Sequence, residues 1–129
     1  MKHALLKFNH GVEIGARLAY LGHYKVTGDT KILAIANEEL EHRKTVKRIL
    51  ETLGHKPFWG FDMFFTLVGN TIQYLCYISP KFALNWVASI MEVFAVFNYT
   101  KLARIYPRFD ITFKDMAEAE KLHEDYFKQ

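Results

Sequence analysis

Cysteine is almost absent from this sequence, because Cys76 is the one cysteine among 129 residues. One thiol cannot form an internal disulfide, so a disulfide-stapled fold is excluded and a reducing compartment fits. The N-terminal stretch MKHALLKFNHGVEIG contains no long apolar segment and no small-residue cleavage site, which argues against a signal peptide. We therefore expect a cytoplasmic protein that is not secreted, and peripheral attachment to the inner membrane face stays open.

The chain also lacks a large excess of either sign of charge. The formal net charge is +3, and the basic residues are dispersed apart from the run HRKTVKR at 42–48. A run this short is more typical of a solvated helix face than of a nucleic-acid site. We expect no nucleic-acid partner.

The alternation of apolar and polar residues that marks strands is missing. Three prolines and seven glycines divide the chain, and between these breaks apolar residues recur at steps of three and four. The chain is long enough to bury a core but short for two domains, so we expect one domain, residues 1–129. The pattern predicts an all-α fold with helices at approximately 2–26, 30–54, 59–78, 81–105 and 113–128.

The longest apolar run is a poor membrane-spanning segment. Phe58 to Ile78 is long enough to span a bilayer, but it contains Asp62, Asn70, Gln73 and two glycines. Two alternatives remain open. The run is either an amphipathic helix in peripheral contact with a membrane, or a crossover helix packed in the core or at a dimer contact.

Two of the predicted helices place ionisable side chains on otherwise apolar faces. The apolar stripe of the second helix is continuous only if Glu39 and His42 fill its middle. In the fourth helix, Glu92 is the one charged residue between Phe82 and Thr100. A lone buried carboxylate is costly unless it is protonated, paired or bound to a cation. These side chains therefore need partners inside the protein.

The first and fifth helices supply candidate partners. Glu13 lies on the apolar face of the first, and Glu120 with His123 repeats the Glu-x-x-His spacing on the fifth. Side chains three residues apart share one helix face, about 5–6 Å apart at Cβ. Four packed helices would thus gather four carboxylates and two imidazoles, and metal cations are the simplest remedy for the repulsion. The candidate metal ligands are Glu13, Glu39, His42, Glu92, Glu120 and His123.

This donor set indicates the metal. Carboxylate oxygen with neutral imidazole suits iron or manganese, and the lack of inward thiolates argues against structural zinc. One Glu from each of two helices and Glu-x-x-His from each of two others is the known arrangement of ferritin-like di-iron carboxylate bundles. By that template Glu39 and Glu120 bridge the metals, Glu13 and Glu92 are terminal ligands, and each His binds one iron. The alternative is a metal-free bundle in which the core Glu and His residues pair with one another. It is unfavourable, because it would bury four acids against two bases.

Several motifs resemble, in order and spacing, those of the demethoxyubiquinone hydroxylases. They are NHGVE (9–13), AYLGH (19–23), EELEH (38–42), LETLGHKP (50–57), the apolar third helix and MEVFAVFNY (91–99). The resemblance implies a ferritin-like four-helix bundle with an additional apolar crossover helix that reaches membrane-held substrate. It also implies a di-iron monooxygenase that uses dioxygen to hydroxylate a quinone-like lipid ring in ubiquinone biosynthesis.

The resemblance also assigns residues and partners. The six iron ligands of the family fall on the six candidates above, and Tyr99 matches a tyrosine beside the site, which implies substrate contact or electron transfer. This chain differs from the family pattern at Asn98, where a histidine is usual, and at His23, where glutamine is usual. It resembles a short, divergent member. The shortened fifth helix either leaves one side of the bundle open for a long apolar substrate or requires a second subunit to cover it, and we expect a homo-oligomer. The electron donor is not identified.

Two other functions remain open. One is a ferritin-like ferroxidase or peroxidase that handles iron or peroxide without an organic substrate. The other is a non-catalytic helical module with a structural metal, which the six oxygen and nitrogen ligands disfavour. His10, inside NHGVE, is expected off the apolar stripe, in a surface or supporting role.

Overall fold

The computed structural model describes residues 3–128, and its regular elements in that range are all helical. This confirms the predicted all-α class. The chain divides into two compact units, Met1–Pro80 and Lys81–Gln129. The single domain 1–129 therefore stays a prediction.

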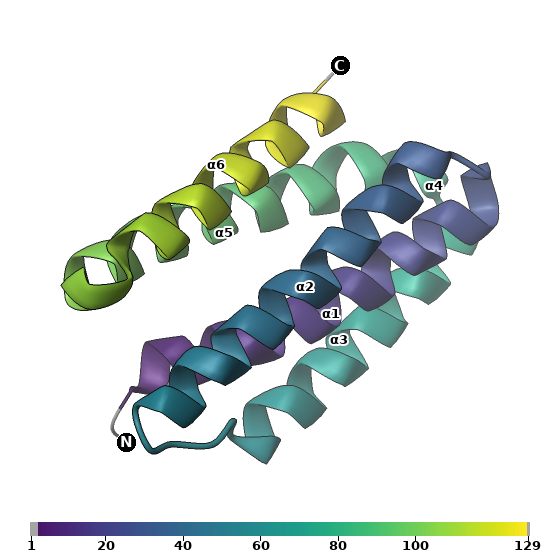
Figure 1. The fold of residues 1–129 in the computed structure, drawn as a ribbon. Coiled ribbons are helices and arrows are strands. Elements are labelled where there is room, and N and C mark those ends of the chain that lie inside the picture. Colours follow the sequence, from purple (N-terminus) through teal and green to yellow (C-terminus); the bar gives the residue numbers. More distant parts are fainter. Residues whose placement is uncertain (1–2, 129) are drawn as a thin grey trace. The chain divides into compact units, whose positions relative to one another are not determined.

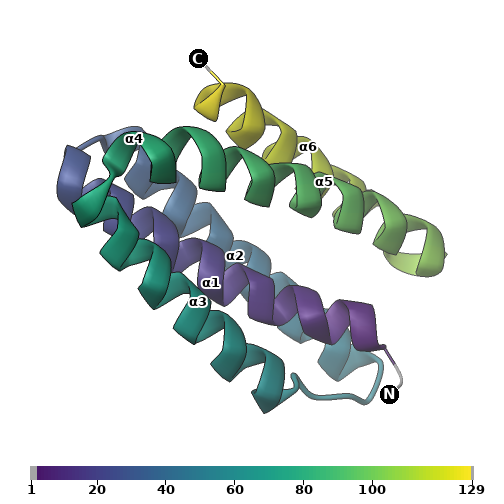
Figure 2. The same ribbon diagram turned by 180° about the vertical axis from the view of Figure 1, so that it is seen from behind.

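Unit 1 consists of three helices, α1 (Ala4–Thr27), α2 (Thr30–Thr52) and α3 (Trp59–Ile78) (Figure 1). Helix α1 packs against both α2 and α3, and Figure 2 shows the three from behind. The bounds of α3 match the prediction, and α2 ends slightly before its predicted end. Residue 2, where the first helix was predicted to begin, lies outside the described range.

Glycines and one aspartate set the turns around α2. Gly28 adopts a φ of 69°, which an L side chain disfavours, and its N–H donates to the Tyr24 carbonyl to end α1. Asp29 then caps α2, because its carboxylate accepts the Lys31 N–H at 2.9 Å. After α2, Gly54 has a φ of 78° and the His55 N–H donates to the Leu50 carbonyl. The sequence therefore fixes both ends of this helix.

Close glycine contacts join α1 to α3. A Cβ built at Gly15 would lie 2.9 Å from the Phe65 carbonyl oxygen, and one at Gly69 would lie 2.8 Å from the Gly15 carbonyl oxygen. Real Cβ atoms essentially never come this close to backbone atoms. Small residues here allow the two backbones to approach. Gln73 adds a hydrogen bond from its side-chain amide to the Leu18 carbonyl at 2.7 Å.

The outer face of α3 is apolar and exposed. The buried residues of this helix are Gly69, Ile72 and Cys76. Its exposed large apolar residues are Trp59, Met63, Phe64, Leu67, Tyr74, Tyr77 and Ile78. None of the helices in residues 3–128 has both the length and the apolar character needed to cross a membrane.

Unit 2 is built on the helix pair α5 (Ala88–Ile105) and α6 (Asp110–Phe127), which pack against each other. The short helix α4 (Pro80–Phe82) and the π-helical segment η1 (Ala83–Val87) precede α5 without a break. A 3₁₀ turn, η2 (Pro107–Phe109), joins the pair. The reversal between α5 and α6 is visible in Figure 1.

The sequence prediction differs from the structure at two points in unit 2. The predicted helix at 81–105 contains the π-helical η1, a wider turn that the apolar spacing did not distinguish from an α-helical one. The predicted helix at 113–128 in fact begins at Asp110. Its first turn is largely polar, so the apolar periodicity becomes visible only at Phe113. Asp110 suits this position because a carboxylate is favoured at a helix N-terminus.

Candidate metal centre

Helices α1 and α2 bring three of the predicted ligands together in unit 1. We call Glu13, Glu39 and His42 the α1–α2 cluster. Each offers a ligand atom, and these atoms lie within 4.8 Å of one another. Glu13 Oε2 lies 3.9 Å from His42 Nδ1. The three-residue spacing of Glu39 and His42 directs both toward α1, as the Glu-x-x-His motif predicted.

The α1–α2 cluster is withdrawn from water. Glu13 and Glu39 are each 1% exposed, and the His42 side chain is 12% exposed. The neighbouring acids Glu38 and Glu41 are exposed. The helical period therefore separates the two inward acids from the outward ones, as the sequence predicted. Two buried carboxylates beside one imidazole form a site that a cation would stabilise.

Helices α5 and α6 form a matching set in unit 2. We call Glu92, Glu120 and His123 the α5–α6 cluster, whose ligand atoms also lie within 4.8 Å of one another. His123 Nδ1 lies 3.3 Å from Glu120 Oε2 and 3.6 Å from Glu92 Oε2. All three residues are buried. The isolated acid of the fourth predicted helix thus has the partners that its burial required.

The protonation of the α5–α6 cluster reflects its crowding. Burial, with the nearby Glu120 carboxylate, raises the pKa of Glu92 well above its usual range. Burial by itself would lower the pKa of His123, but hydrogen bonds to Glu120 and Glu92 outweigh it and raise that pKa to about 11. Protons therefore compensate the paired carboxylates. A bound metal cation would replace these protons as the compensating charge.

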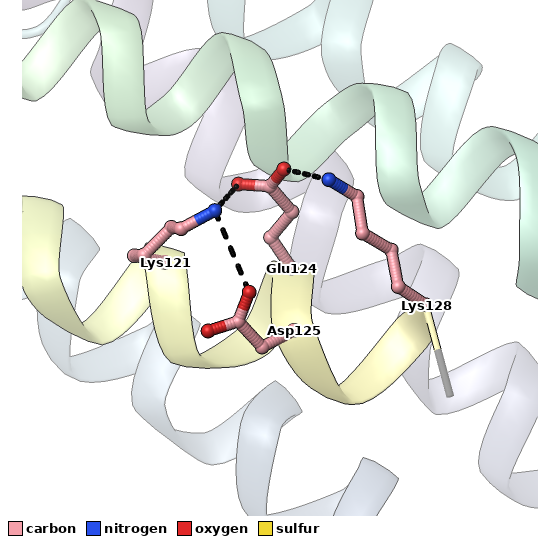
Figure 3. A network of polar contacts seen from close by, with 4 residues as sticks. All are labelled: Lys121, Glu124, Asp125 and Lys128. Atoms are coloured by element: carbon pink, nitrogen blue, oxygen red, sulfur yellow. Dashed lines mark hydrogen bonds and ion pairs between the residues drawn. The ribbon is translucent and has the colours of Figure 1, made fainter.

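A nearby buried acid has the opposite electrostatics. Glu124 is buried on α6, but Lys128 Nζ donates to Glu124 Oε1 at 2.6 Å and Lys121 Nζ to Glu124 Oε2 at 3.2 Å. Figure 3 shows both lysines, with Lys121 also 3.4 Å from Asp125. The hydrogen bond from Lys128, supported by Lys121, lowers the pKa of Glu124. A carboxylate compensated by two cations has no need of a metal, whereas Glu92 and Glu120 share one imidazole.

The donor chemistry of each cluster fits a metal such as iron or manganese. Both clusters combine two carboxylates with one imidazole, and neither contains a thiol. The one cysteine, Cys76, is buried on α3, and burial raises the pKa of its thiol to about 11. The buried Glu and His clusters could therefore hold metal ions. Three donor residues leave coordination positions open for further ligands.

The other residues singled out from the sequence are buried. Tyr99 lies on α5, where its ring stacks on Phe113 of α6 with centroids 6.3 Å apart. Asn98 precedes it and is 7% exposed. His23 lies on α1 with its ring 6.0 Å from Tyr20, and burial lowers its pKa to about 4. It therefore stays neutral near pH 7.

Of the two roles expected for His10, the surface position was wrong, and a supporting role stays a prediction. His10 is 5% exposed, and its Nδ1 lies 2.9 Å from Asp62 Oδ1 on α3. The predicted stripe considered one buried face of α1, but this helix has a second face against α3. Gly11 and Gly15, which contact α3, were the available signal. The burial of Glu124 was likewise not anticipated, because charged neighbours hide it in the sequence.

No family model, no curated protein and no solved structure matches the chain. The resemblance to demethoxyubiquinone hydroxylases therefore depends on the sequence motifs and on the two Glu and His clusters described above.

Proposed function

We propose that this protein is a di-iron, dioxygen-dependent monooxygenase that hydroxylates the ring of a quinone-like lipid. One observation carries this proposal: each unit buries the same donor set, a Glu-x-x-His pair and a Glu from a second helix. One such set has ordinary explanations, including a paired core histidine. Two sets in one chain match the requirements of a two-metal site.

The order of the helices supports a ferritin-like bundle as the finer description of the fold. The ligand-bearing helices occur as two consecutive pairs, α1 with α2 and α5 with α6, separated by α3. Ferritin-like bundles join two helix pairs by one long crossover connection. We assign α3 to this crossover. By that template Glu39 and Glu120 would be the ligands shared by the two metals, and the other four residues would hold one metal each.

The side chains have distinct tasks in the proposed reaction. The carboxylates and imidazoles would hold the metals, and their burial would keep bulk water from the oxidising centre. Iron would supply the redox chemistry for dioxygen, with further electrons from a reductant or from the reduced substrate. We place Tyr99 beside the substrate or on the electron path, because it lies on the helix of Glu92, is buried and matches the family's tyrosine.

The exposed face of α3 supports access to a lipid substrate. Trp59, Met63, Phe64 and Leu67 present aromatic and thioether groups of the kind that lie at membrane interfaces. We propose that this face contacts the membrane peripherally. Co-flotation with lipid vesicles tests the contact, and an α3 face that instead joins two subunits would appear as a dimer without vesicle binding.

Hydroxylation is tested with isotopically labelled dioxygen. The protein is loaded with ferrous iron under anaerobic conditions, mixed with a short-chain quinol and exposed to the labelled gas. We expect one labelled oxygen atom in the ring of the product. Glu120→Gln should abolish product formation, whereas Glu118→Gln, an exposed acid on the same helix, should retain it.

Ferroxidase or peroxidase activity is the second candidate, because the same donor set binds iron in either case. Under the same conditions it predicts oxidation of iron, or loss of added peroxide, with no labelled ring product. That result would reject the hydroxylase and retain the metal centre. A parent protein that binds no iron would reject both.

A further inference from the structure

Unit 1 contains a large cavity with cationic walls that the proposed reaction does not use. Its volume is about 970 Å³, within the range of small-molecule sites. Residues of α1, the C-terminal half of α2, the following loop and the start of α3 line it. Its cationic lining residues are Arg43, Lys44, Lys47 and Lys56.

Three of these cations lack an acidic partner. Within residues 3–128, Arg43, Lys47 and Lys56 form no ion pair, whereas Lys44 lies 3.3 Å from Glu41. Arg43 is half-buried, which makes its uncompensated charge more costly than that of a fully solvated residue. The cavity therefore has a surplus of positive charge.

The two carboxylates in the lining do not remove this surplus. Asp62 is held by His10 at 2.9 Å, and Glu51 is exposed on the last turn of α2. Neither forms an ion pair with a lysine or arginine among the described residues. Four cations therefore face two acids, one of which is already engaged.

Helix stability does not explain the positions of these cations. Basic residues favour a helix C-terminus, but the last turn of α2 contains none. Arg43 and Lys47 are instead four residues apart on one helix face, where like charges destabilise the helix. Such a cost is expected where the charges serve binding, and a bound anion would remove it.

The loop after α2 holds Lys56 at the cavity. Gly54 adopts a positive φ, and the His55 N–H bonds the Leu50 carbonyl at 2.8 Å. His55 also packs edge-on against His3, with ring centroids 4.5 Å apart. Backbone geometry thus holds the loop, and Lys56 stands on this loop as an exposed residue of the cavity lining.

We propose that this cavity binds a small molecule that carries a diphosphate group. Arg43 offers the planar donor fork that suits phosphate oxygens, and the lysines of the lining add point charges. Three unpaired cations match the charge of a diphosphate at neutral pH. The lining residues of this site lie in unit 1, and none of them is a member of the α1–α2 cluster.

Calorimetric titration of the full chain with pyrophosphate tests this site. The protein is used without metal, because pyrophosphate would otherwise chelate the metal. We expect one saturable site per chain. Arg43→Gln and Lys47→Gln should each weaken binding about tenfold or more, the loss expected for a hydrogen bond to a charged group. Lys31→Gln removes the same charge from the N-terminal end of α2, outside the cavity, and should change the affinity less than about twofold.

Parallel titrations with inorganic phosphate and citrate define the ligand class. Weaker binding of both would support diphosphate recognition. The site is rejected if pyrophosphate shows no saturable binding, if Lys31→Gln weakens it as much as Lys47→Gln, or if citrate binds as tightly as pyrophosphate. Circular dichroism of each variant verifies that the loss of affinity is not a loss of fold.

Discussion

The partners of a buried carboxylate decide its chemistry in this protein. Glu92 and Glu124 are both buried in unit 2, but their pKa values shift in opposite directions. Burial and a second carboxylate raise the pKa of Glu92, whereas Lys128 and Lys121 lower that of Glu124. The sequence distinguishes the two in part, because Glu92 stands alone in an apolar helix, whereas Glu124 has lysines three residues before it and four residues after it.

This contrast predicts different effects of two matched substitutions. Metal-free Glu92→Gln should be at least as stable as the parent, because it removes a carboxyl that is unfavourable in its charged form. It should also lose the increase in unfolding free energy that metal binding gives the parent. For the parent this increase is about 2.7 kcal/mol when the free metal concentration is 100 times the Kd. Chemical denaturation with and without metal measures both.

Glu124→Gln is the control for that experiment. It should cost no more than about 1 kcal/mol, since its lysine partners are largely exposed, and it should retain the full metal effect. A Glu92→Gln protein that metal stabilises as much as the parent would remove Glu92 from the ligand set.

His23 predicts a pH dependence of stability. Its pKa is about 4 in the folded protein against 6.5 for a free histidine, so the unfolded chain binds a proton that the folded chain excludes. The stability from neutral His23 is present above pH 6.5 and is lost as the pH falls from 6.5 to 4, by about 1.4 kcal/mol per pH unit. His23→Gln should flatten this part of the stability profile, measured by denaturation at a series of pH values. Parallel profiles for the two proteins would contradict the assignment.

The helices of this chain were predictable because apolar residues follow the helical period. That period located the buried faces of α1, α2 and α6, and with them five members of the two clusters; Glu92 on α5 was found as the one charged residue of an apolar helix. The period did not reveal the second buried face of α1, since glycines carry no apolar signal and His10 reads as polar. It also missed the first turn of α6 and the π-helical η1, where polar residues and backbone hydrogen bonding determine the structure.

The α1–α3 contact predicts the effect of a single methyl group. Gly15→Ala would place a Cβ 2.9 Å from the Phe65 carbonyl oxygen, so the two backbones must move apart. Overpacking costs about 1–3 kcal/mol and exceeds or cancels the gain of about 1 kcal/mol in helix propensity. We expect a net loss of up to about 2 kcal/mol in unfolding free energy.

Gly60→Ala provides the comparison on α3. The closest atoms to its added Cβ belong to the Phe58 ring, at 2.6 Å, and this side chain can rotate away. It should therefore be less destabilising than Gly15→Ala in the same denaturation experiment. The reverse order would show that close backbone approach does not limit this helix pair.

At the scale of the whole molecule, the two units repeat one chemical pattern on different helix pairs. Each carries two buried carboxylates and one imidazole, and the residues that line the cationic cavity of unit 1 belong to neither cluster. The repetition was predictable because Glu-x-x-His occurs twice on apolar helix faces. The substrate was not predictable, because no residue spacing in the sequence specifies the ring or the chain length of a substrate.

Metal stoichiometry tests the central claim most directly. The protein is loaded anaerobically with excess ferrous iron, freed of unbound metal and analysed for iron per chain. We predict two iron ions for the parent and for Glu38→Gln, an exposed acid beside Glu39, and a loss of bound iron in Glu39→Gln and in His123→Ala. A parent chain that retains no iron, or a Glu39→Gln chain that retains two, would contradict the metal centre proposed for this protein.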